Sequence, residues 1–453
     1  MRTVDGATFR ERLWEAAAVT RDLLAHGGPT RWEFFAKASS TVATELSGTG
    51  TSAITRTEET GVAVRTWHAG RTGFGAGSGL GVDASRRALE GASSSECPAA
   101  FDPLPPPQQL GTVEPPARPG MHDPAWAEAA AHDVAKEIES AAGTAVSLSH
   151  LAVRHGTWAW VLATGEGFVA SWEDAAAAVT AEIEVRGSPR GAWRERVPIT
   201  DPATFDPAAV ADRITSRALL TLGRTTVDHG IKDLLLHPEV AAHLVAGLVP
   251  LMVVSAPDRD PLPSLLNRHG ELASRTLTLV DTRIDPSAPV TAPCDGEGVP
   301  GGRTLLVEHG VPRHRIGCYR DSVACGDTPR GGAVRLSYRA APTSGPTNLR
   351  VETDAGLPPG EMLRSARRAL YLLRPVASVE CDLDRDDYRI IASGVWLEDG
   401  VARGWHPIVE LRGRLGTLLR RLEAVGTDRA WFDTPHGAVG APSMLIRRQP
   451  VVS

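Results

Sequence analysis

The spacing of apolar residues, together with capping signals, predicts several helices in the first half of the chain. Apolar positions recur at helical intervals over residues 9–25, and residues 124–142 are expected to form a second helix. Asp206 followed by Pro207 predicts the start of a third helix, because aspartate is a preferred N-cap and proline is tolerated at the first helical position.

Strand patterns separate these helices. Apolar and polar residues alternate over 61–67, as they do in a half-buried strand. A glycine-dense stretch at 73–81 and a helix at 84–92 come next, which indicates a β-hairpin that enters a helix. Further strand-like runs follow the second helix. We therefore predict an α/β domain over residues 1–225.

The pattern changes near residue 225, where a second domain is predicted to begin. A short strand leads into a helix from 238 to about 251, and β-type runs then dominate to the end of the chain. Two helices, at 358–373 and 415–425, are expected to interrupt these runs. These features predict an α+β domain rich in antiparallel strands over residues 226–453.

A proline-rich segment at 93–123 interrupts the first domain. Its prolines lack a backbone N–H and fix φ, so no regular helix or strand is expected there. The segment is predicted to be a linker or a long surface loop. The sequence leaves open whether it gates a cavity or only connects elements.

Composition and charge bound the classes of partner. The chain has 453 residues with 42% hydrophobic and 23% charged positions, which is ordinary for a globular protein. The net charge of −6 offers no electrostatic support for binding nucleic acid. We expect a cytoplasmic protein without a membrane partner, because no apolar run reaches about 18 residues and no secretory signal is evident. Five cysteines without paired spacing agree with a reducing compartment.

The segment 274–349 carries the most distinctive order of motifs. An apolar run ends at Asp281, the acidic turn Asp295-Gly-Glu297-Gly follows, and Gly345-Pro-Thr-Asn348 closes the segment. This order resembles the C-terminal half of the TldD/PmbA family, the modulator-of-gyrase peptidases, and the resemblance covers most of the chain. It implies a two-domain subunit that pairs with a second subunit to enclose a chamber for extended peptides.

The family contains two kinds of subunit, which differ at a zinc motif. TldD-like subunits carry His-Glu-x-x-x-His, in which two histidines and a distant cysteine bind zinc while the glutamate acts as base. At the matching place this chain reads His237-Pro238-Glu239-Val-Ala-Ala-His243. Histidines six positions apart lie on opposed faces of a helix. We expect instead that His237 flanks an N-cap, that Pro238 begins the helix and that Glu239 complements the helix dipole.

The second half of the zinc motif is also absent. The segment that matches the ligand cysteine of TldD-like chains, Thr434-Pro-His436-Gly, contains no cysteine, and His436 is expected to be an ordinary loop histidine. The resemblance therefore implies a TldE-like (PmbA-like) subunit with no catalytic residue, no metal ligand and no cofactor of its own. Zinc is expected in a TldD-like partner, and the substrate is expected to be an unfolded or extended peptide, such as the precursor of a peptide natural product.

Two other functions remain open at this point. One is an active zinc peptidase with a rearranged site made of His237, Glu239 and His243. The other is a stand-alone biosynthetic or peptide-binding protein on the same fold. Metal analysis distinguishes the first from a non-catalytic subunit, and co-purification with a TldD-like chain argues against the second.

Candidate substrate-cavity residues lie in the same distinctive segment. Asp295 and Glu297 are paired carboxylates, which can bind cations or transfer protons. Arg335, Tyr338 and Asn348 could form hydrogen bonds to an extended peptide. Each of the five also has a structural interpretation, because acidic glycine turns and polar loop residues fix the connections between strands.

Overall fold

The computed structural model describes most of the chain. The described residues are 8–25, 31–47, 52–98, 103–110, 124–142, 145–188, 191–199, 202–223, 230–254 and 265–451. The domain boundary expected near residue 225 and positions 99–102 and 111–123 of the proline-rich segment lie outside these ranges.

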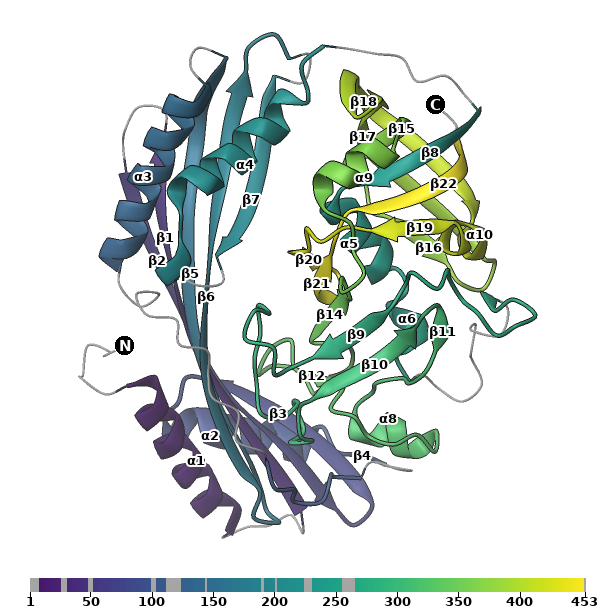
Figure 1. Cartoon of the computed structure of the whole chain (residues 1–453). Coiled ribbons are helices and arrows are strands. Elements are labelled where there is room, and N and C mark those ends of the chain that lie inside the picture. Colours follow the sequence, from purple (N-terminus) through teal and green to yellow (C-terminus); the bar gives the residue numbers. More distant parts are fainter. Residues whose placement is uncertain are drawn as a thin grey trace.

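The N-terminal half is built on one seven-stranded sheet, seen edge-on as the long strands in Figure 1. In spatial order the strands are β4 (Cys97–Pro98), β3 (Arg71–Ser78), β2 (Ser52–His68), β1 (Arg31–Ser47), β5 (Val146–Thr164), β6 (Val169–Val185) and β7 (Ala192–Ile199). All neighbouring strands are antiparallel. The α/β prediction for this half therefore needs correction: it mixes helices with strands, but in its described residues the strands form an antiparallel sheet and no helix connects parallel strands.

Three helices cover one face of this sheet, and a fourth helix comes after the last strand of the sheet in the chain. They are α1 (Phe9–Ala25), α2 (Val82–Ser94), α3 (Pro124–Ala142) and, after the 3₁₀ turn at Pro202–Thr204, α4 (Pro207–Leu219). On β1, Phe34 and Ala36 pack with α1 and α2, whereas Phe35 lies in a separate cluster with Tyr338. Strand alternation thus leaves the second face of the sheet for the C-terminal half.

Several local predictions for this half are confirmed. The bounds of α1 and α3 coincide with the expected helices. The β2–β3 hairpin enters α2, as the glycine pattern indicates. Asp206 is the N-cap of α4, and its carboxylate accepts the amide of Ala208 at 2.9 Å. The proline-rich segment is more regular at its start than expected, because Ser94 ends α2 and Cys97–Pro98 pair with β3.

The C-terminal half contains two larger sheets and a short hairpin. The first sheet has the order β11 (Val311–Pro312), β10 (Arg303–Glu308), β9 (Leu279–Thr282), β14 (Asn348–Val351), β21 (Gly437–Ala441) and β20 (Ala430–Thr434). The second has the order β16 (Glu380–Asp382), β17 (Asp387–Glu398), β15 (Arg368–Pro375), β8 (Gly230–Leu236), β22 (Met444–Val451) and β19 (Leu422–Val425), with β18 (Val401–Arg414) paired to β17. The hairpin joins β12 (Ala333–Val334) to β13 (Thr343–Ser344).

Short helices complete this half. They are α5 (Pro238–Ala246), α6 (Val249–Met252), α8 (Tyr319–Ala324), α9 (Pro359–Ser365) and α10 (Leu415–Arg420). Helix α5 contacts strands of both larger sheets, so its apolar residues form part of the core between them. Within the described ranges, only the β14–β21 and β15–β8 strand pairs are parallel. The antiparallel character expected of this half is thus observed.

Three helix predictions for this half are wrong in extent, and α8 was not expected. The expected helix 358–373 ends at Ser365, and the apolar run that follows becomes β15 between β8 and β17. The expected helix 415–425 ends at Arg420, and β19 follows. The helix expected from 238 to about 251 is divided into α5 and α6. A short apolar run that is buried on both sides has the same pattern in a helix and in a strand. Its secondary structure is therefore determined by whether it is buried within a sheet.

The two halves pack against each other through the second face of the N-terminal sheet. Phe35 and Leu162 from that face form an apolar cluster with Cys294 and Tyr338 from the C-terminal half. A second core cluster also includes residues of both halves. No helix in the described part of the chain is long and apolar enough to cross a membrane.

Candidate functional site

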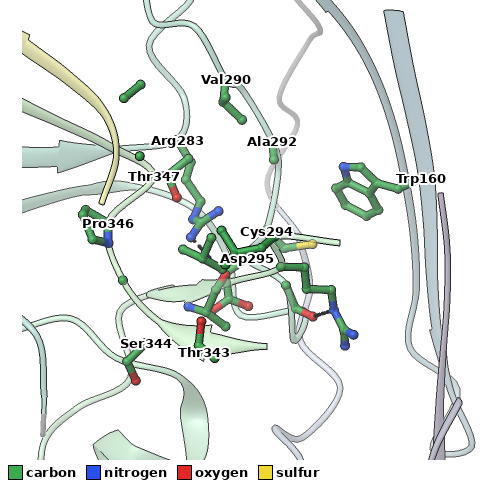
Figure 2. A pocket seen from close by; sticks show the side chains of 18 of the residues that line it. Trp160, Arg283, Val290, Ala292, Cys294, Asp295, Thr343, Ser344, Pro346 and Thr347 are labelled. Atoms are coloured by element: carbon green, nitrogen blue, oxygen red, sulfur yellow. Dashed lines mark hydrogen bonds between the residues drawn. The ribbon is translucent and has the colours of Figure 1, made fainter. Parts of the chain in front are cut away.

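A cavity of about 510 Å³ lies between the N-terminal sheet and the C-terminal half; we call it the central cavity. The sheet contributes Phe35 and Lys37 from β1 and Trp158, Trp160 and Leu162 from β5. These residues fall at alternate positions, so they share one face of the sheet. The opposite wall comes from residues 290–296, the β12–β13 hairpin and residues 343–347. Figure 2 shows Trp160 facing Cys294 and Ala292 across this space.

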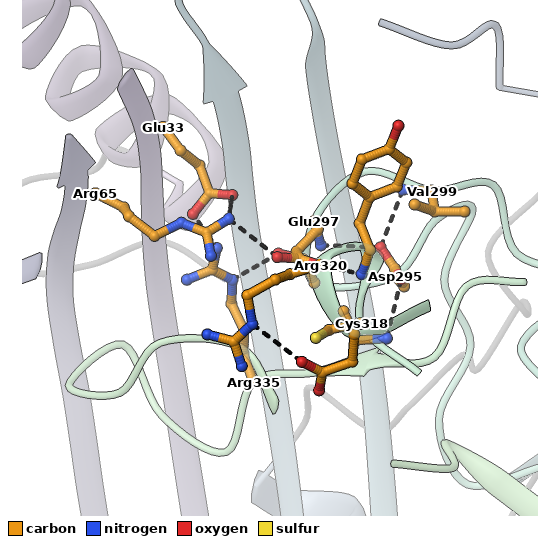
Figure 3. A network of polar contacts seen from close by, with 12 residues as sticks. Glu33, Arg65, Asp295, Glu297, Val299, Cys318, Arg320 and Arg335 are labelled. Atoms are coloured by element: carbon orange, nitrogen blue, oxygen red, sulfur yellow. Dashed lines mark hydrogen bonds and ion pairs between the residues drawn. The ribbon is translucent and has the colours of Figure 1, made fainter. Parts of the chain in front are cut away.

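A buried ion network closes one side of the central cavity (Figure 3). Glu33 on β1 pairs with Arg65 at 3.2 Å and with Arg335 of the C-terminal half. Arg65 also pairs with Glu297 at 3.0 Å, so two carboxylates and two guanidinium groups alternate across the junction. Burial opposes ionisation of Glu33, but Arg335 and Arg65 hold its pKa below the ordinary value. The network therefore joins the halves through buried ion pairs, with Glu33 held in its charged form.

Asp295 organises the acidic turn rather than facing the cavity as a free carboxylate. It accepts the backbone amides of Glu297, Val299 and Ala333, each at 2.9 Å. Burial raises the pKa of Asp295, although Arg283 and these amides oppose the shift. Burial also raises the pKa of Glu297, whose second oxygen accepts the amide of Tyr319 at 2.7 Å. Both carboxylates thus hold the wall in shape.

Tyr338 and Asn348 lie behind the wall. Tyr338 is buried, its hydroxyl lies 3.0 Å from that of Ser78, and its ring covers Gly61 of β2. The Asn348 side chain donates to the carbonyls of Thr282 and Val290, at 2.7 and 2.6 Å. Asn348 therefore fastens the loop 282–290, which leads into the cavity wall.

The five residues predicted for the substrate cavity thus lie in one region, but they have different roles. Asp295 and Arg335 line the central cavity, whereas Glu297, Tyr338 and Asn348 support it from behind. Four further residues that line the cavity were not expected from the sequence: Lys37, Trp158, Trp160 and Arg283. Alternation along β1 and β5 was the available signal, but it does not reveal which face meets the second half.

A second pocket, of about 370 Å³, is lined by two residues of the altered zinc motif, Glu239 and His243, but not by His237; we call it the His243 pocket. Glu239 and His243 of α5 line it together with His436, which lies in the turn between β20 and β21. Pro435 and His436 also line the central cavity, so the two spaces adjoin. The structure therefore brings His436 to α5, where a third ligand would be needed.

Glu239 is held by two arginines and is not free to act on water. Arg217 of α4 donates to one carboxylate oxygen at 2.7 Å, and Arg374 of β15 donates to the other at 3.2 Å. Arg217 also pairs with Glu195 of β7 at 2.6 Å, so this network too joins the two halves. Burial opposes ionisation of Glu239, but Arg217 and Arg374 lower its pKa.

His237 is the N-cap of α5, rather than a residue that flanks the cap. Its Nδ1 accepts the amide of Glu239 at 3.1 Å, and its ring packs near Tyr371 and Phe432. Burial lowers its pKa well below the ordinary value, and the nearby Arg217 adds to the shift. Pro238 begins the helix, as expected. His237 is therefore a neutral structural group.

These residues do not fit a zinc ion. Within the described ranges, no three His, Cys, Asp or Glu side chains are placed to hold a metal. His237 uses Nδ1 in the helix cap, Glu239 is saturated by guanidinium groups, and His436 is exposed. Two arginines beside Glu239 would also repel a dication. The site thus differs from that of a zinc hydrolase, which keeps its ligands and its base free for the metal and the water.

The fold is that of the TldD/TldE-like proteins. TldE from Thermococcus kodakarensis is 15% identical, with a TM-score of 0.83 over 99% of this chain and 100% of that one. Two proteins described as proposed modulators of DNA gyrase are also similar. The one from Thermotoga maritima is 16% identical, with a TM-score of 0.79 over 98% of this chain and 100% of that one. The one from Bacteroides thetaiotaomicron is 17% identical, with a TM-score of 0.80 over 100% of both chains.

Sequence comparison identifies the family through the second half of the chain. Residues 230–453 match the family described as PmbA/TldA metallopeptidase C-terminal domain. The C-terminal half of the chain thus belongs to the PmbA/TldD metallopeptidase family, and the whole chain has the TldD/TldE-like fold. No curated protein matches its sequence.

Proposed function

We propose that this chain is the non-catalytic, TldE-like subunit of a heteromeric zinc metallopeptidase. The observation that carries the proposal is the state of Glu239, whose two carboxylate oxygens are both engaged by arginines. A carboxylate in that state cannot accept a proton from a metal-bound water without breaking a buried ion network. A TldD-like partner with His-Glu-x-x-x-His would supply the zinc and the base.

In this proposal the chain contributes a wall of the peptide chamber. The central cavity is large enough for peptide side chains, and typical ligand pockets measure roughly 300–1,000 Å³. Asp295 and Arg335 would form part of the wall next to the substrate, while Glu297, Tyr338 and Asn348 would support that wall from behind. The substrate class is an unfolded or extended peptide, including precursors of peptide natural products.

The zinc content of the purified chain tests the non-catalytic assignment. We expect zinc far below one ion per chain, measured by elemental mass spectrometry after dialysis against a weak chelator. The His243→Ala and His436→Ala variants should give the same value as the unmodified protein. Stoichiometric zinc that either substitution removes would contradict the proposal.

One observation favours the alternative of an active zinc peptidase. Glu239, His243 and His436 line the same pocket, so rotation of Glu239 away from its arginines would bring a carboxylate and two imidazoles together. In that case Arg217→Met and Arg374→Met, which release Glu239, should raise the zinc affinity of the chain. Unchanged affinity in both variants is the result that the non-catalytic assignment predicts.

A further inference from the structure

Lys37 is a cation without a partner in the wall of the central cavity. It lies on β1 directly opposite Trp160 of β5, and no hydrogen bond or ion pair joins its ammonium to any described residue. Glu59, the acidic residue that influences its pKa, is paired with Arg339 at 2.8 Å. Burial lowers the pKa of Lys37, and Glu59 only partly opposes this. A partly buried ammonium without a partner is unfavourable, and an anion that pairs with it would stabilise it.

The opposite wall does not supply that anion. Asp295 uses its carboxylate for three backbone amides, and Arg335 is paired with Glu33. Arg283 donates to the carbonyls of Gly331 and Ala333 and has no carboxylate within salt-bridge distance among the described residues. Arg283 interacts electrostatically with the buried carboxylates of Asp281 and Asp295, whereas Lys37 has no carboxylate partner among the described residues. Lys37 is therefore the cation of the cavity wall that lacks an anion.

The sheet side of the lining is apolar apart from Lys37, because Phe35, Trp158, Trp160 and Leu162 all line the cavity there. On the other side, the buried Oγ1 of Thr347 has no hydrogen-bond partner in the described part of the chain. A ligand that satisfies all three features has an anionic group, an apolar or aromatic body and a further polar group.

We propose that the central cavity binds an apolar or aromatic carboxylic acid, with the carboxylate on Lys37 and the apolar body against Trp158 and Trp160. The C-terminal residue of a peptide and a free N-acyl amino acid share this chemistry. For a peptide terminus the proposal rests on the proposed function and adds a residue that would recognise the substrate. The binding site lies in this chain alone, so its test does not require a partner subunit.

Titration calorimetry of the isolated chain with acids and matched amides tests the site. N-acetyl-L-phenylalanine should bind, and N-acetyl-L-phenylalanine amide should bind about tenfold more weakly or worse, because it lacks the charge that meets Lys37. The peptide Ala-Ala-Phe with a free carboxylate distinguishes the sources. Tighter binding than the acetylated amino acid indicates a peptide terminus, and weaker binding indicates a small free acid.

Three variants separate the role of Lys37 from a general effect of charge. Lys37→Met should weaken binding of the acid about tenfold or more, whereas Lys37→Arg should retain most of it. Lys136→Met removes a lysine exposed on α3 and should leave binding unchanged. Equal affinity for acid and amide, or equal affinity of Lys37→Met and the unmodified protein, would overturn the proposal.

A measurement on the unmodified protein covers the case in which Lys37→Met fails to fold. The chain has only three lysines, Lys37, Lys136 and Lys232, so acetic anhydride labelling can be read for each by mass spectrometry. N-acetyl-L-phenylalanine should slow acetylation of Lys37 and not of Lys136, and equal rates with and without the acid would contradict the site. Because no peptidase partner is present, either result leaves the subunit assignment untouched.

Discussion

At the scale of single residues, His237 and Glu239 show how a metal motif becomes structural support. A ring nitrogen of His237 accepts a hydrogen bond in the helix cap. Both carboxylate oxygens of Glu239 accept hydrogen bonds, from Arg217 and Arg374. Each group is fixed by a contact that would compete with a metal or a water. The residue types of a hydrolase are thus present in part, but their ring nitrogen and carboxylate oxygens already take part in hydrogen bonds within the fold.

The neutral state of His237 makes stability depend on pH. Its pKa in the folded chain lies well below 6.5, whereas the unfolded chain takes up a proton near that value. Below about pH 6.5 the unfolded state therefore binds more protons than the folded state. The contribution of His237 to the free energy of unfolding is fully present above that pH and is lost on acidification.

We expect His237→Asn to reduce that loss, because asparagine keeps a good N-cap and does not titrate. The measurement is the urea midpoint of both proteins at pH 7 and pH 5. The unmodified protein should lose more between the two values than the variant does. An equal decrease in both proteins would show that His237 is not the group responsible.

At the scale of elements, the close approach of β2 to the loop before β13 depends on a glycine. A Cβ placed on Gly61 would lie 2.2 Å from the Tyr338 ring, which is buried and fixed by the junction. The ring can therefore lie flat on β2 only while residue 61 lacks a side chain.

Gly61→Ala should destabilise the protein by about 1–3 kcal/mol, because the ring or the strand must move to relieve overpacking. Gly302→Ala is a suitable control, since a Cβ there meets no atom within 4 Å. Chemical denaturation of both variants provides the comparison. Similar denaturation midpoints for the two variants would mean that the Tyr338 ring can move aside without loss of stability.

The sequence predicts elements well where local chemistry decides them. Asp206 and Pro207 mark the start of α4, and the N-cap contact forms as expected. Prediction from the sequence fails where tertiary burial determines the secondary structure. An example is β15, which lies between two strands and whose apolar run was predicted to be part of a helix. The region of the candidate site was visible in the motifs around Asp295. Lys37 and His436 were not placed, because strand pairing and packing of the halves bring them there.

At the scale of the whole molecule, two buried ion networks join the halves on either side of the cavities. One contains Glu33, Arg65, Arg335 and Glu297, and the other centres on Arg217. Buried ion pairs add little stability over apolar packing, but loss of one member leaves an uncompensated charge. The networks are therefore suited to fixing how the sheet and the C-terminal half meet, and hence the shape of the cavity.

Arg217→Met should destabilise the chain by about 3 kcal/mol, because it removes the closer of the two arginines that Glu195 and Glu239 share and leaves only Arg374 between two buried carboxylates. Arg196→Met is a matched control, since Arg196 joins β7 to β20 through an exposed pair with Asp433. That change should cost no more than about 1 kcal/mol. Thermal unfolding of both variants tests the difference, and equal shifts would contradict a special role for the buried network.

The most direct test of the account is a peptide-hydrolysis assay of three samples. They are this chain alone, a TldD-like chain with His-Glu-x-x-x-His from the same organism alone, and an equimolar mixture, each supplied with zinc and an unfolded peptide. We predict cleavage by the mixture and none by this chain alone, because Glu239 is engaged by Arg217 and Arg374. Cleavage by this chain alone, abolished in His243→Ala, would contradict its assignment as the non-catalytic subunit.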